Sequence, residues 1–346
     1  MKRSLLFAGL VAALGAASLV YLRYDAALDR AREVVNRGGL VAETSAGPIE
    51  YVEAGAGAPL LSIHGAGGGY DQGLANAAGL VGEGFRVIAP SRFGYLRTPV
   101  PSDTSPAAQA DSHAALLAEL NVSKAIVVGV STGARSALEL AIRRPDAVAA
   151  LILIVPGTYS PASPVSIEAN RGNAFAFWAV NAGGDFAWWA AESLAPSVLV
   201  RFIGVPPDLV AAAPSAERDR VMQIVRAIEP LSLRFRGINI DSTPDLRELP
   251  LHEIAAPTLV ISARDDLFNT LPAAEFAASR IPGAQLIVYD TGGHLLVGRQ
   301  EEVRDAVRSF LDSAGVGAPQ AVAAAAPSQQ PARARGERSR RRPQAL

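Results

Sequence analysis

Between residues 40 and 313, short apolar runs alternate with longer amphipathic segments, and this alternation limits the fold more than any other feature. Six apolar runs predict buried strands: Pro59–Ile63, Phe85–Ala89, Ala125–Val128, Ala150–Val155, Thr258–Ile261 and Gln285–Tyr289. The segments between them predict four helices: Ala107–Leu120, Ala134–Arg143, Ala273–Arg280 and Glu301–Ser313. Two earlier runs, Leu40–Glu43 and Ile49–Glu53, fit an antiparallel edge. The sequence therefore predicts an α/β fold with a mostly parallel eight-stranded sheet flanked by helices.

One interval, Ser160–Leu249, interrupts the alternation. It contains helical patterns but no convincing strand, and it holds all three tryptophans of the chain. Because it lies between the sixth and seventh predicted strands, we expect a helical cap packed on the sheet. The predicted organisation is a core over residues 40–159 and 250–313, with a cap over residues 160–249.

The first 39 residues follow a different pattern. Leu5–Leu22 is an uncharged run of 18 residues, which as a helix would be about 27 Å long, close to the roughly 30 Å of a bilayer hydrocarbon core. Residues 1–22 thus predict either an export signal, cleaved at the small residues Gly15–Ala17, or a retained membrane anchor. We favour the anchor, because the apolar run continues into a polar helical linker over residues 23–39.

Composition excludes several classes of protein and site. The chain has no cysteine, which rules out disulfides, thiolate nucleophiles and cysteine-ligated metals. No histidine–glutamate cluster suggests a metal, no glycine-rich loop has a nucleotide-binding pattern, and a net charge of -1 gives no reason to expect nucleic acid. We expect no metal and no cofactor. Residues 314–346, rich in Ala, Pro and Arg, predict a disordered basic tail.

A candidate nucleophile, Ser131, lies at the centre of Gly129-Val130-Ser131-Thr132-Gly133. The five-residue pattern is weak by itself, but here a predicted strand precedes it and a predicted helix follows it. Such a turn holds a serine in a strained backbone, and it needs small neighbours because the strand and helix approach closely on either side. The helix N-terminus also points amide groups at the region where negative charge develops.

A serine hydroxyl needs a base, and the chain has four histidines. His294 is the best candidate, because it follows the last predicted strand on a glycine-rich loop, at the strand end where an open α/β sheet places its site. The imidazole needs an acid to orient it. Asp265 and Asp266 both follow the seventh strand at the same edge, and the residue pattern alone does not choose between them.

With these residues the chain resembles the α/β-hydrolase superfamily, which has the chain order Ser, Asp, His. The resemblance covers roughly residues 48–311. In that family the acid follows a Gly-x-x-Asp pattern, which selects Asp266 here although Ala263 replaces the glycine. The resemblance also implies an oxyanion hole formed by the backbone N–H groups of Ala66 and Thr132, with Gly67 as a substitute for Ala66, and a bracing role for His64.

The segment Pro90–Tyr95 departs from the pattern that the family shows after its fourth strand. The loop beside the site, and any substrate contact that it makes, are therefore not predicted by the resemblance.

These residues predict a serine hydrolase that cleaves an ester-like bond of a small, apolar or aromatic substrate through an acyl-enzyme. The resemblance leaves two alternatives open: hydrolysis of a carbon–carbon bond in a diketone-like compound, and a ligand receptor that keeps the triad without turnover. Cap aromatics, among them Trp178, Trp188 and Trp189, either line an apolar substrate pocket or pack the cap itself.

Basic residues flank the apolar run on both sides, so the orientation of the body is not fixed by charge alone. Lys2 and Arg3 precede the run, whereas four arginines follow it between residues 23 and 37. The charge rule leans weakly towards a cytoplasmic body. Because hydrolases with such anchors are commonly exported, we favour the periplasmic side. The sequence does not predict an oligomeric state.

Overall fold

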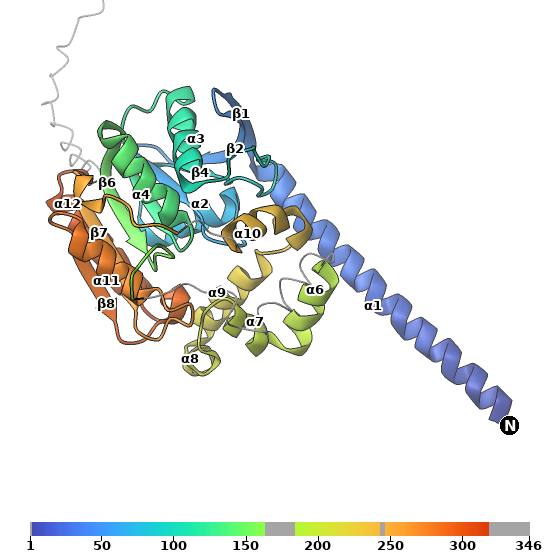
Figure 1. Ribbon diagram of the computed structural model, residues 1–346. Coiled ribbons are helices and arrows are strands. Elements are labelled where there is room, and N and C mark those ends of the chain that lie inside the picture. Colours follow the sequence, from blue (N-terminus) through green and yellow to red (C-terminus); the bar gives the residue numbers. More distant parts are fainter. Residues whose placement is uncertain (1, 163–183, 243–245, 318–346) are drawn as a thin grey trace, which may run out of the picture.

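A computed structural model of the chain describes residues 2–162, 184–242 and 246–317. Its centre is one eight-stranded sheet with the order β1-β2-β4-β3-β5-β6-β7-β8 (Figure 1). The strands are β1 (Leu40–Thr44), β2 (Gly47–Ala54), β3 (Ala58–Ile63), β4 (Phe85–Pro90), β5 (Ala125–Val130), β6 (Val148–Ile154), β7 (Thr258–Ala263) and β8 (Gln285–Tyr289). β1 and β2 pair antiparallel and β2 joins β4 antiparallel, while all other pairs are parallel. The predicted sheet and its antiparallel edge are confirmed.

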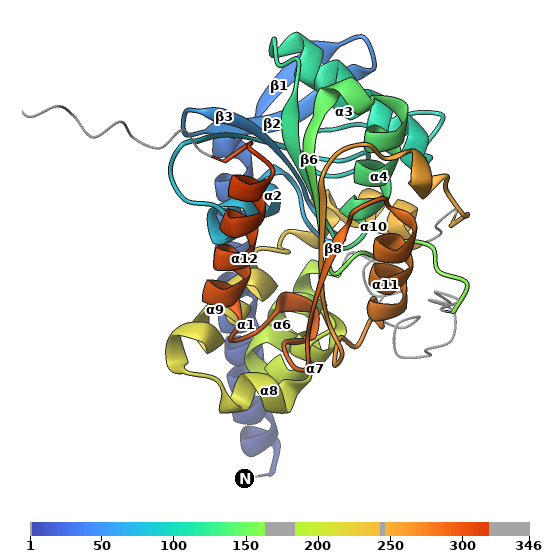
Figure 2. The ribbon, with the colours of Figure 1, turned by 90° about the vertical axis from the view of Figure 1, so that its left-hand side faces the viewer.

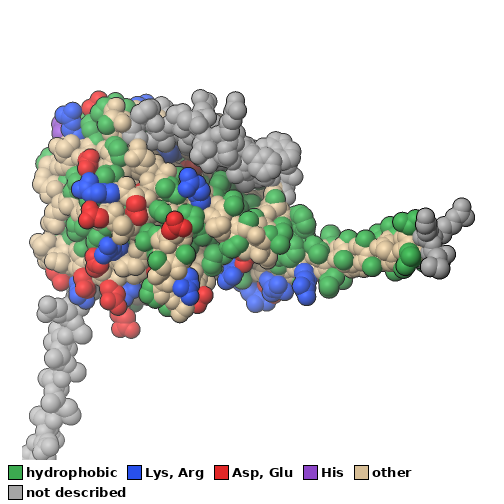
Figure 3. Space-filling model, turned by 90° about the horizontal axis from the view of Figure 1, so that it is seen from below, with side chains coloured by type: hydrophobic (Ala, Val, Ile, Leu, Met, Phe, Trp, Pro, Cys, Tyr) green, Lys and Arg blue, Asp and Glu red, His purple; other side chains and the backbone are tan. Residues whose placement is uncertain are grey.

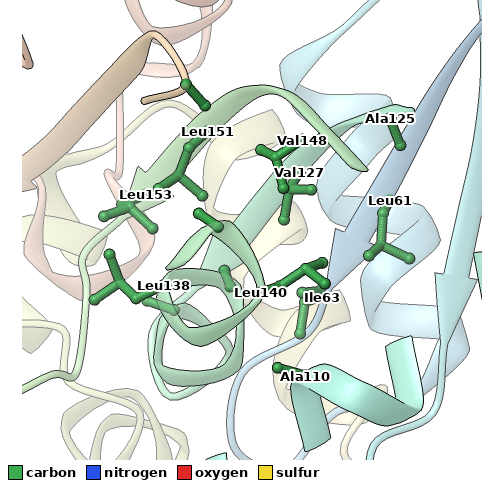
Figure 4. Packing of buried hydrophobic residues seen from close by; sticks show 14 of the residues in the cluster. Leu61, Ile63, Ala110, Ala125, Val127, Leu138, Leu140, Val148, Leu151 and Leu153 are labelled. Carbon is green, nitrogen blue, oxygen red and sulfur yellow. The ribbon is translucent and has the colours of Figure 1, made fainter. Parts of the chain in front are cut away.

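Helices cover both faces of this sheet (Figure 2). One face carries α3 (Pro106–Glu119), α4 (Gly133–Arg143) and α11 (Leu271–Arg280), and the other carries α2 (Tyr70–Leu80) and α12 (Gln300–Ser313). Consecutive residues of β5 serve the two faces in turn: Val127 packs towards α3 and α4, whereas Ile126 and Val128 pack towards α2 and α12. Figure 4 shows the first of these cores, to which Val127, Leu138 and Leu153 belong. A sheet buried on both faces explains the continuous apolar runs of its central strands.

α2 is the one core helix that the sequence analysis did not predict. Its sequence contains Gly73 and Gly79, and glycine lowers helix propensity. Gly73 is nevertheless needed, because a β-carbon there would lie 2.8 Å from the Ser62 carbonyl oxygen. Packing against the sheet therefore outweighs a weak intrinsic preference.

The elements described in the interval between β6 and β7 are helices, joined by turns and irregular segments. It contains α6 (Asp185–Leu194), α7 (Pro196–Phe202), α8 (Pro207–Ala212), α9 (Ser215–Arg226) and α10 (Phe235–Ser242), with a short 3-10 helix, η3 (Leu231–Leu233). These helices share their own apolar core, which includes Trp188, Val205 and Val221. We refer to this unit as the cap.

Residues 2–38 form a single helix, α1 (Lys2–Gly38), that projects far from the body (Figure 1). One helix thus contains both the predicted apolar segment and the predicted linker. By length and composition it is long and apolar enough to cross a membrane.

Candidate functional site

Ser131 directly follows β5 and precedes α4, as the sequence predicted. Its φ of 52° lies in the left-handed region, which is strained for a residue with a β-carbon. The turn is fixed on both sides, since Ser131 N–H donates to the Ile154 carbonyl (2.9 Å) and its own carbonyl accepts from Gly157 N–H (2.9 Å). The chain therefore presents the serine at the carboxyl end of the sheet on a sharp strand-to-helix turn.

The two glycines that flank this turn are required by space. A β-carbon on Gly129 would lie 2.8 Å from the Ala134 α-carbon, and one on Gly133 would lie 2.5 Å from the His64 carbonyl oxygen. Real β-carbons do not approach backbone atoms so closely, so any larger residue would push α4 away from β5 or β3.

His294 lies after β8, in the short 3-10 helix η5 (Gly293–Leu295), and its side chain is buried. Its Nδ1 is 2.9 Å from Asp266 Oδ2, so the two residues that sequence analysis paired are hydrogen-bonded. The second Asp266 oxygen accepts from Phe268 N–H at 2.9 Å, and the Thr270 hydroxyl also donates to the carboxylate. The edge of the Phe268 ring meets the imidazole, with ring centroids 4.7 Å apart.

The electrostatics of this pair favour a charged carboxylate. Burial alone would raise the pKa of Asp266, but the charge of His294 and the hydrogen bonds from His294, Thr270 and Phe268 outweigh it, so the pKa is lowered. A carboxylate held ionised beside Nδ1 fixes the imidazole tautomer with Nε2 free to accept a proton.

Asp265 has a different partner, the backbone. Its Oδ1 accepts from Gly293 N–H at 2.7 Å and so holds the loop that carries His294. The structure thus separates the two adjacent aspartates that the residue pattern left open: Asp266 bonds the imidazole, and Asp265 bonds the loop. Among the described residues, no hydrogen bond joins the Ser131 hydroxyl to His294; such bonds are often long in a free enzyme and tighten in the substrate complex.

The glycine loop after β3 lies against the serine turn. A β-carbon on Gly65 would lie 3.1 Å from the Ser131 β-carbon, which places the loop next to the candidate nucleophile. The backbone N–H groups of Ala66 and Thr132 make no hydrogen bond to a described backbone or side-chain group. Gly67 N–H, the predicted substitute for Ala66, donates instead to the Tyr95 hydroxyl at 3.3 Å.

The other three histidines lie in surroundings that differ from those of His294. His64 is buried, with Nδ1 donating to the Gly65 carbonyl (2.7 Å) and Nε2 accepting from Arg92 N–H (2.9 Å). Burial and then the charge of Arg92 hold the pKa of His64 well below its usual value, so the ring is neutral. His113 lies inside α3 against Ser136, and burial lowers its pKa to about 3. His252 is exposed in a short 3-10 helix, η4 (Leu251–Glu253).

Sequence analysis missed a buried ionic cluster beside the serine turn. Asp241 of α10 accepts two hydrogen bonds from the Arg92 guanidinium (2.8 and 2.6 Å), one from the Tyr95 hydroxyl (2.5 Å) and one from the Thr132 hydroxyl (3.1 Å). Burial would raise the pKa of Asp241, but the charges of Arg92 and Arg135 and the hydrogen bonds from Arg92 and Tyr95 lower it to about 2. The only signal in the sequence was that Pro90–Tyr95 departs from the family pattern.

This cluster joins the cap to both elements of the candidate oxyanion hole. Asp241 bonds the side chain of Thr132, whose N–H is one candidate donor, while Tyr95 bonds Gly67 in the loop that carries the other. Arg92, Thr132 and Asp241 also line a cavity of about 640 Å³. From the cap, Arg234 donates to the Gly68 carbonyl at 2.6 Å and pairs with Asp71.

The predicted cap aromatics divide into three cases. Trp188 packs in the cap core, with its indole N–H donating to the Val225 carbonyl at 3.1 Å. Trp189 lies next to Tyr24 of α1, with ring centroids 5.7 Å apart. Trp178 lies outside the described residues. In the part of the chain that the structure describes, no group of histidine and carboxylate side chains could hold a metal ion.

The fold and the serine turn define a hydrolase of the α/β type, and comparison with known proteins identifies the family. The family model for the alpha/beta hydrolase fold matches residues 58–298, and the chain belongs to this family. A putative carbamate hydrolase, RutD, from Klebsiella pneumoniae (strain 342) is 28% identical over 241 residues, 69% of this chain and 85% of the relative.

Two solved structures extend this similarity. An alpha/beta hydrolase fold protein from Nakamurella multipartita is 29% identical with a TM-score of 0.62, covering 80% of this chain and 100% of the other. A membrane phospholipase A, described as a bacterial virulence factor, is 22% identical with a TM-score of 0.60, covering 91% of this chain and 99% of the other.

Proposed function

We propose that the protein is a serine hydrolase in which Ser131, His294 and Asp266 act as a catalytic triad on an ester-like bond. The observation that carries the proposal is the hydrogen bond between Asp266 and His294, on the same sheet edge as the strained turn of Ser131. His294 Nε2 takes the Ser131 proton while Oγ attacks the carbonyl carbon. The same proton then passes to the leaving alkoxide, and water releases the acyl group by the reverse sequence.

The negative charge that develops on the carbonyl oxygen needs donors that are already in place. The N–H groups of Ala66 and Thr132 make no hydrogen bond among the described residues. They are suitable, since Thr132 is the N-cap of α4 directly after Ser131, and Ala66 follows Gly65, which lies against Ser131. His64, which bonds Gly65 and Arg92, braces the loop that carries Ala66.

Three classes of substrate are compatible with the proposed triad. An ester fits the acyl-enzyme chemistry most directly. A carbamate has the same carbonyl at one higher oxidation level, and the relative from Klebsiella is named for such a substrate. A diketone-like compound is the carbon–carbon alternative. A panel with one nitrophenyl ester, one aryl carbamate and one diketone, scored by kcat/KM, separates them.

We also infer that α1 is a retained membrane anchor. A single helix without interruption carries the apolar residues 5–22 and then packs on the body through Leu28 and Val35. A solved structure similar to this chain over 91% of its length is described as a membrane phospholipase A, which is consistent with an anchor. The similarity to that phospholipase indicates a shared fold and does not identify the substrate.

A fluorophosphonate probe tests for an activated serine. Wild-type protein should be labelled, and Ser131→Ala should lose the label together with about 10³-fold or more of kcat. Ser279→Ala, an exposed serine on α11, is the matched control and should keep both. Labelling of folded Ser131→Ala at the wild-type rate would disprove the assignment. An unlabelled wild type that binds ligand without turnover would favour the receptor alternative.

A further inference from the structure

The exposure of α1 changes abruptly at Tyr24. Every side chain from Leu5 to Arg23 is exposed, although residues 5–22 carry no charge. From Tyr24 onwards one stripe turns inward: Tyr24, Leu28, Ala31 and Val35 are buried or half-buried and lie three or four residues apart. That spacing is one face of a helix. The outer part of α1 therefore has no partner among the described residues, while the inner part is docked.

The docked part is held in a fixed position. The Tyr70 hydroxyl, at the start of α2, donates to the Val35 carbonyl at 2.9 Å, and Arg97 bonds the Gly39 carbonyl just past the helix. The helix cannot swing freely about its end, so the apolar part has a defined direction relative to the body.

The cap meets α1 at the level where the apolar run ends. The Tyr24 ring contacts Phe186 edge-on, with centroids 5.2 Å apart, and lies 5.7 Å from Trp189. Tyr24 is only two residues beyond Leu22, about 3 Å along the helix axis. Tyrosine and tryptophan gather at the boundary between lipid and water, because their rings are apolar with one polar group.

Large apolar side chains of α6 and α7 are exposed beside this junction. Phe186 is 48% exposed, Leu194 84% and Val198 61%; we call these three residues the cap face. Phe186 and Leu194 are eight residues apart and so lie on one side of α6. Figure 3 shows hydrophobic side chains along the outer part of α1 and again on the body where α1 leaves it. A single exposed leucine needs no explanation, but a cluster at the foot of an apolar helix does.

We propose that the cap face rests on the surface of the same lipid bilayer into which residues 5–22 of α1 insert. The direction of α1 and its contact with α6 bring the cap face to the boundary of the bilayer, where apolar side chains enter the region between head groups and acyl chains. Arg23, exposed at the first position after the apolar run, can bind anionic head groups.

This placement has a consequence for the substrate, which rests on the proposed function. The turn after α7 reaches the site directly, because the Gly204 carbonyl accepts from His294 N–H at 3.1 Å. A cap that lies on lipid at α6 and α7 and touches His294 at Gly204 brings the site close to esters dissolved in the membrane.

Single cysteines test the surface, since the chain has none of its own. Leu194→Cys and Val198→Cys in the full-length protein would carry an environment-sensitive fluorophore in phosphatidylcholine–phosphatidylglycerol vesicles. Leu286→Cys is the control, an exposed leucine on the edge strand β8. Blue-shifted emission and quenching by lipid-borne nitroxide are expected at both cap positions and absent at position 286.

Two outcomes would overturn the proposal. In one, the labels at positions 194 and 198 stay as solvent-exposed as the label at 286. In the other, they are shielded equally in detergent, and unlabelled Leu194→Cys chains form disulfide-linked dimers, which would assign the cap face to a second copy of the chain.

An activity measurement tests the consequence separately. The double variant Leu194→Glu/Val198→Glu should keep turnover of a soluble nitrophenyl ester within about twofold, and should lose about tenfold or more with an ester dissolved in vesicles. Equal effects on both esters would contradict delivery from the membrane. If wild type hydrolyses neither ester, the proposed function fails, while the fluorescence result still decides the surface.

Discussion

Asp265 and Asp266 are adjacent in sequence but have different partners, and the difference can be measured. Asp266→Asn replaces the charged partner of His294 Nδ1 with an amide that can favour the wrong tautomer, so kcat should fall by about 10⁴-fold. Asp265→Asn keeps an oxygen for Gly293 N–H and should cost much less. Steady-state kinetics at neutral pH, with folding checked by circular dichroism, compares the two variants. Equal losses would mean that the loop contact matters as much as the imidazole contact.

Asp241 offers a second test at the scale of one residue. Asp241→Asn leaves the buried Arg92 guanidinium without its counter-charge, and breaking such a pair costs about 3–5 kcal/mol. Because Asp241 also positions Thr132, kcat for an ester should fall in protein that remains folded. Urea unfolding and ester kinetics measure the two effects, with Asp208→Asn on the exposed side of α8 as the control. Wild-type values for both would show that the cluster is dispensable.

At the scale of elements, the cap contains a carboxyl group with an unusual environment. Burial, and then the charges of Glu192 and Asp185, raise the pKa of Glu229 to about 7. A raised carboxyl pKa means that the folded state keeps a proton that the unfolded state has already lost. Stability from this group is therefore present below the unfolded pKa of about 4.3 and is lost as the pH rises towards 7.

Glu229→Gln should remove this pH dependence. The variant should match wild type near pH 4.5 and be more stable by about 1 kcal/mol at pH 8, a value that allows for the partial solvent exposure of the group. Thermal unfolding at several pH values measures the difference, and Glu275→Gln, exposed on α11, is the control. A difference in melting temperature that does not change between pH 5 and 8 would contradict the prediction.

For the strands, the local sequence pattern was sufficient to predict where each one begins and ends. All eight strands lie within two residues of their predicted bounds, because strands buried on both faces of a sheet appear in the sequence as short continuous apolar runs. α2 was missed because its two glycines lower helix propensity and it has few large apolar residues to mark a helical period, while its stability comes from packing on the sheet. The predicted tail falls largely on residues 318–346, outside the described residues.

At the scale of the whole molecule, α1 has an exposed apolar part, which we propose inserts into lipid, and a part that is docked on the body. A chain that starts at Tyr24 keeps the docked stripe, so it should fold, hydrolyse a soluble ester and no longer float with vesicles. A chain that starts at Gly39 also loses the packing of Leu28 and Val35, which should cost about 2–4 kcal/mol. Vesicle flotation and urea unfolding distinguish the two. Equal stability of both chains would show that the docked contacts contribute nothing.

The sequence by itself determined the sheet, the position of the cap, the candidate nucleophile and the candidate base. Each of these depends on residues that are close along the chain: an apolar period, a glycine-flanked turn, a histidine after the last strand. The tertiary structure decided which aspartate faces His294, because adjacent side chains point in different directions and only the packed loops fix which one meets the ring.

Only the tertiary structure could show the cluster of Arg92 and Asp241, since the two residues are 149 positions apart. No local pattern records a partner at that distance, and each charge alone looks like an ordinary surface residue. The same holds for the cap face: its exposed apolar side chains point to a membrane surface only because α1 lies beside them. Contacts between distant segments form only when the chain has folded, so their chemistry is a property of the fold and not of any one segment.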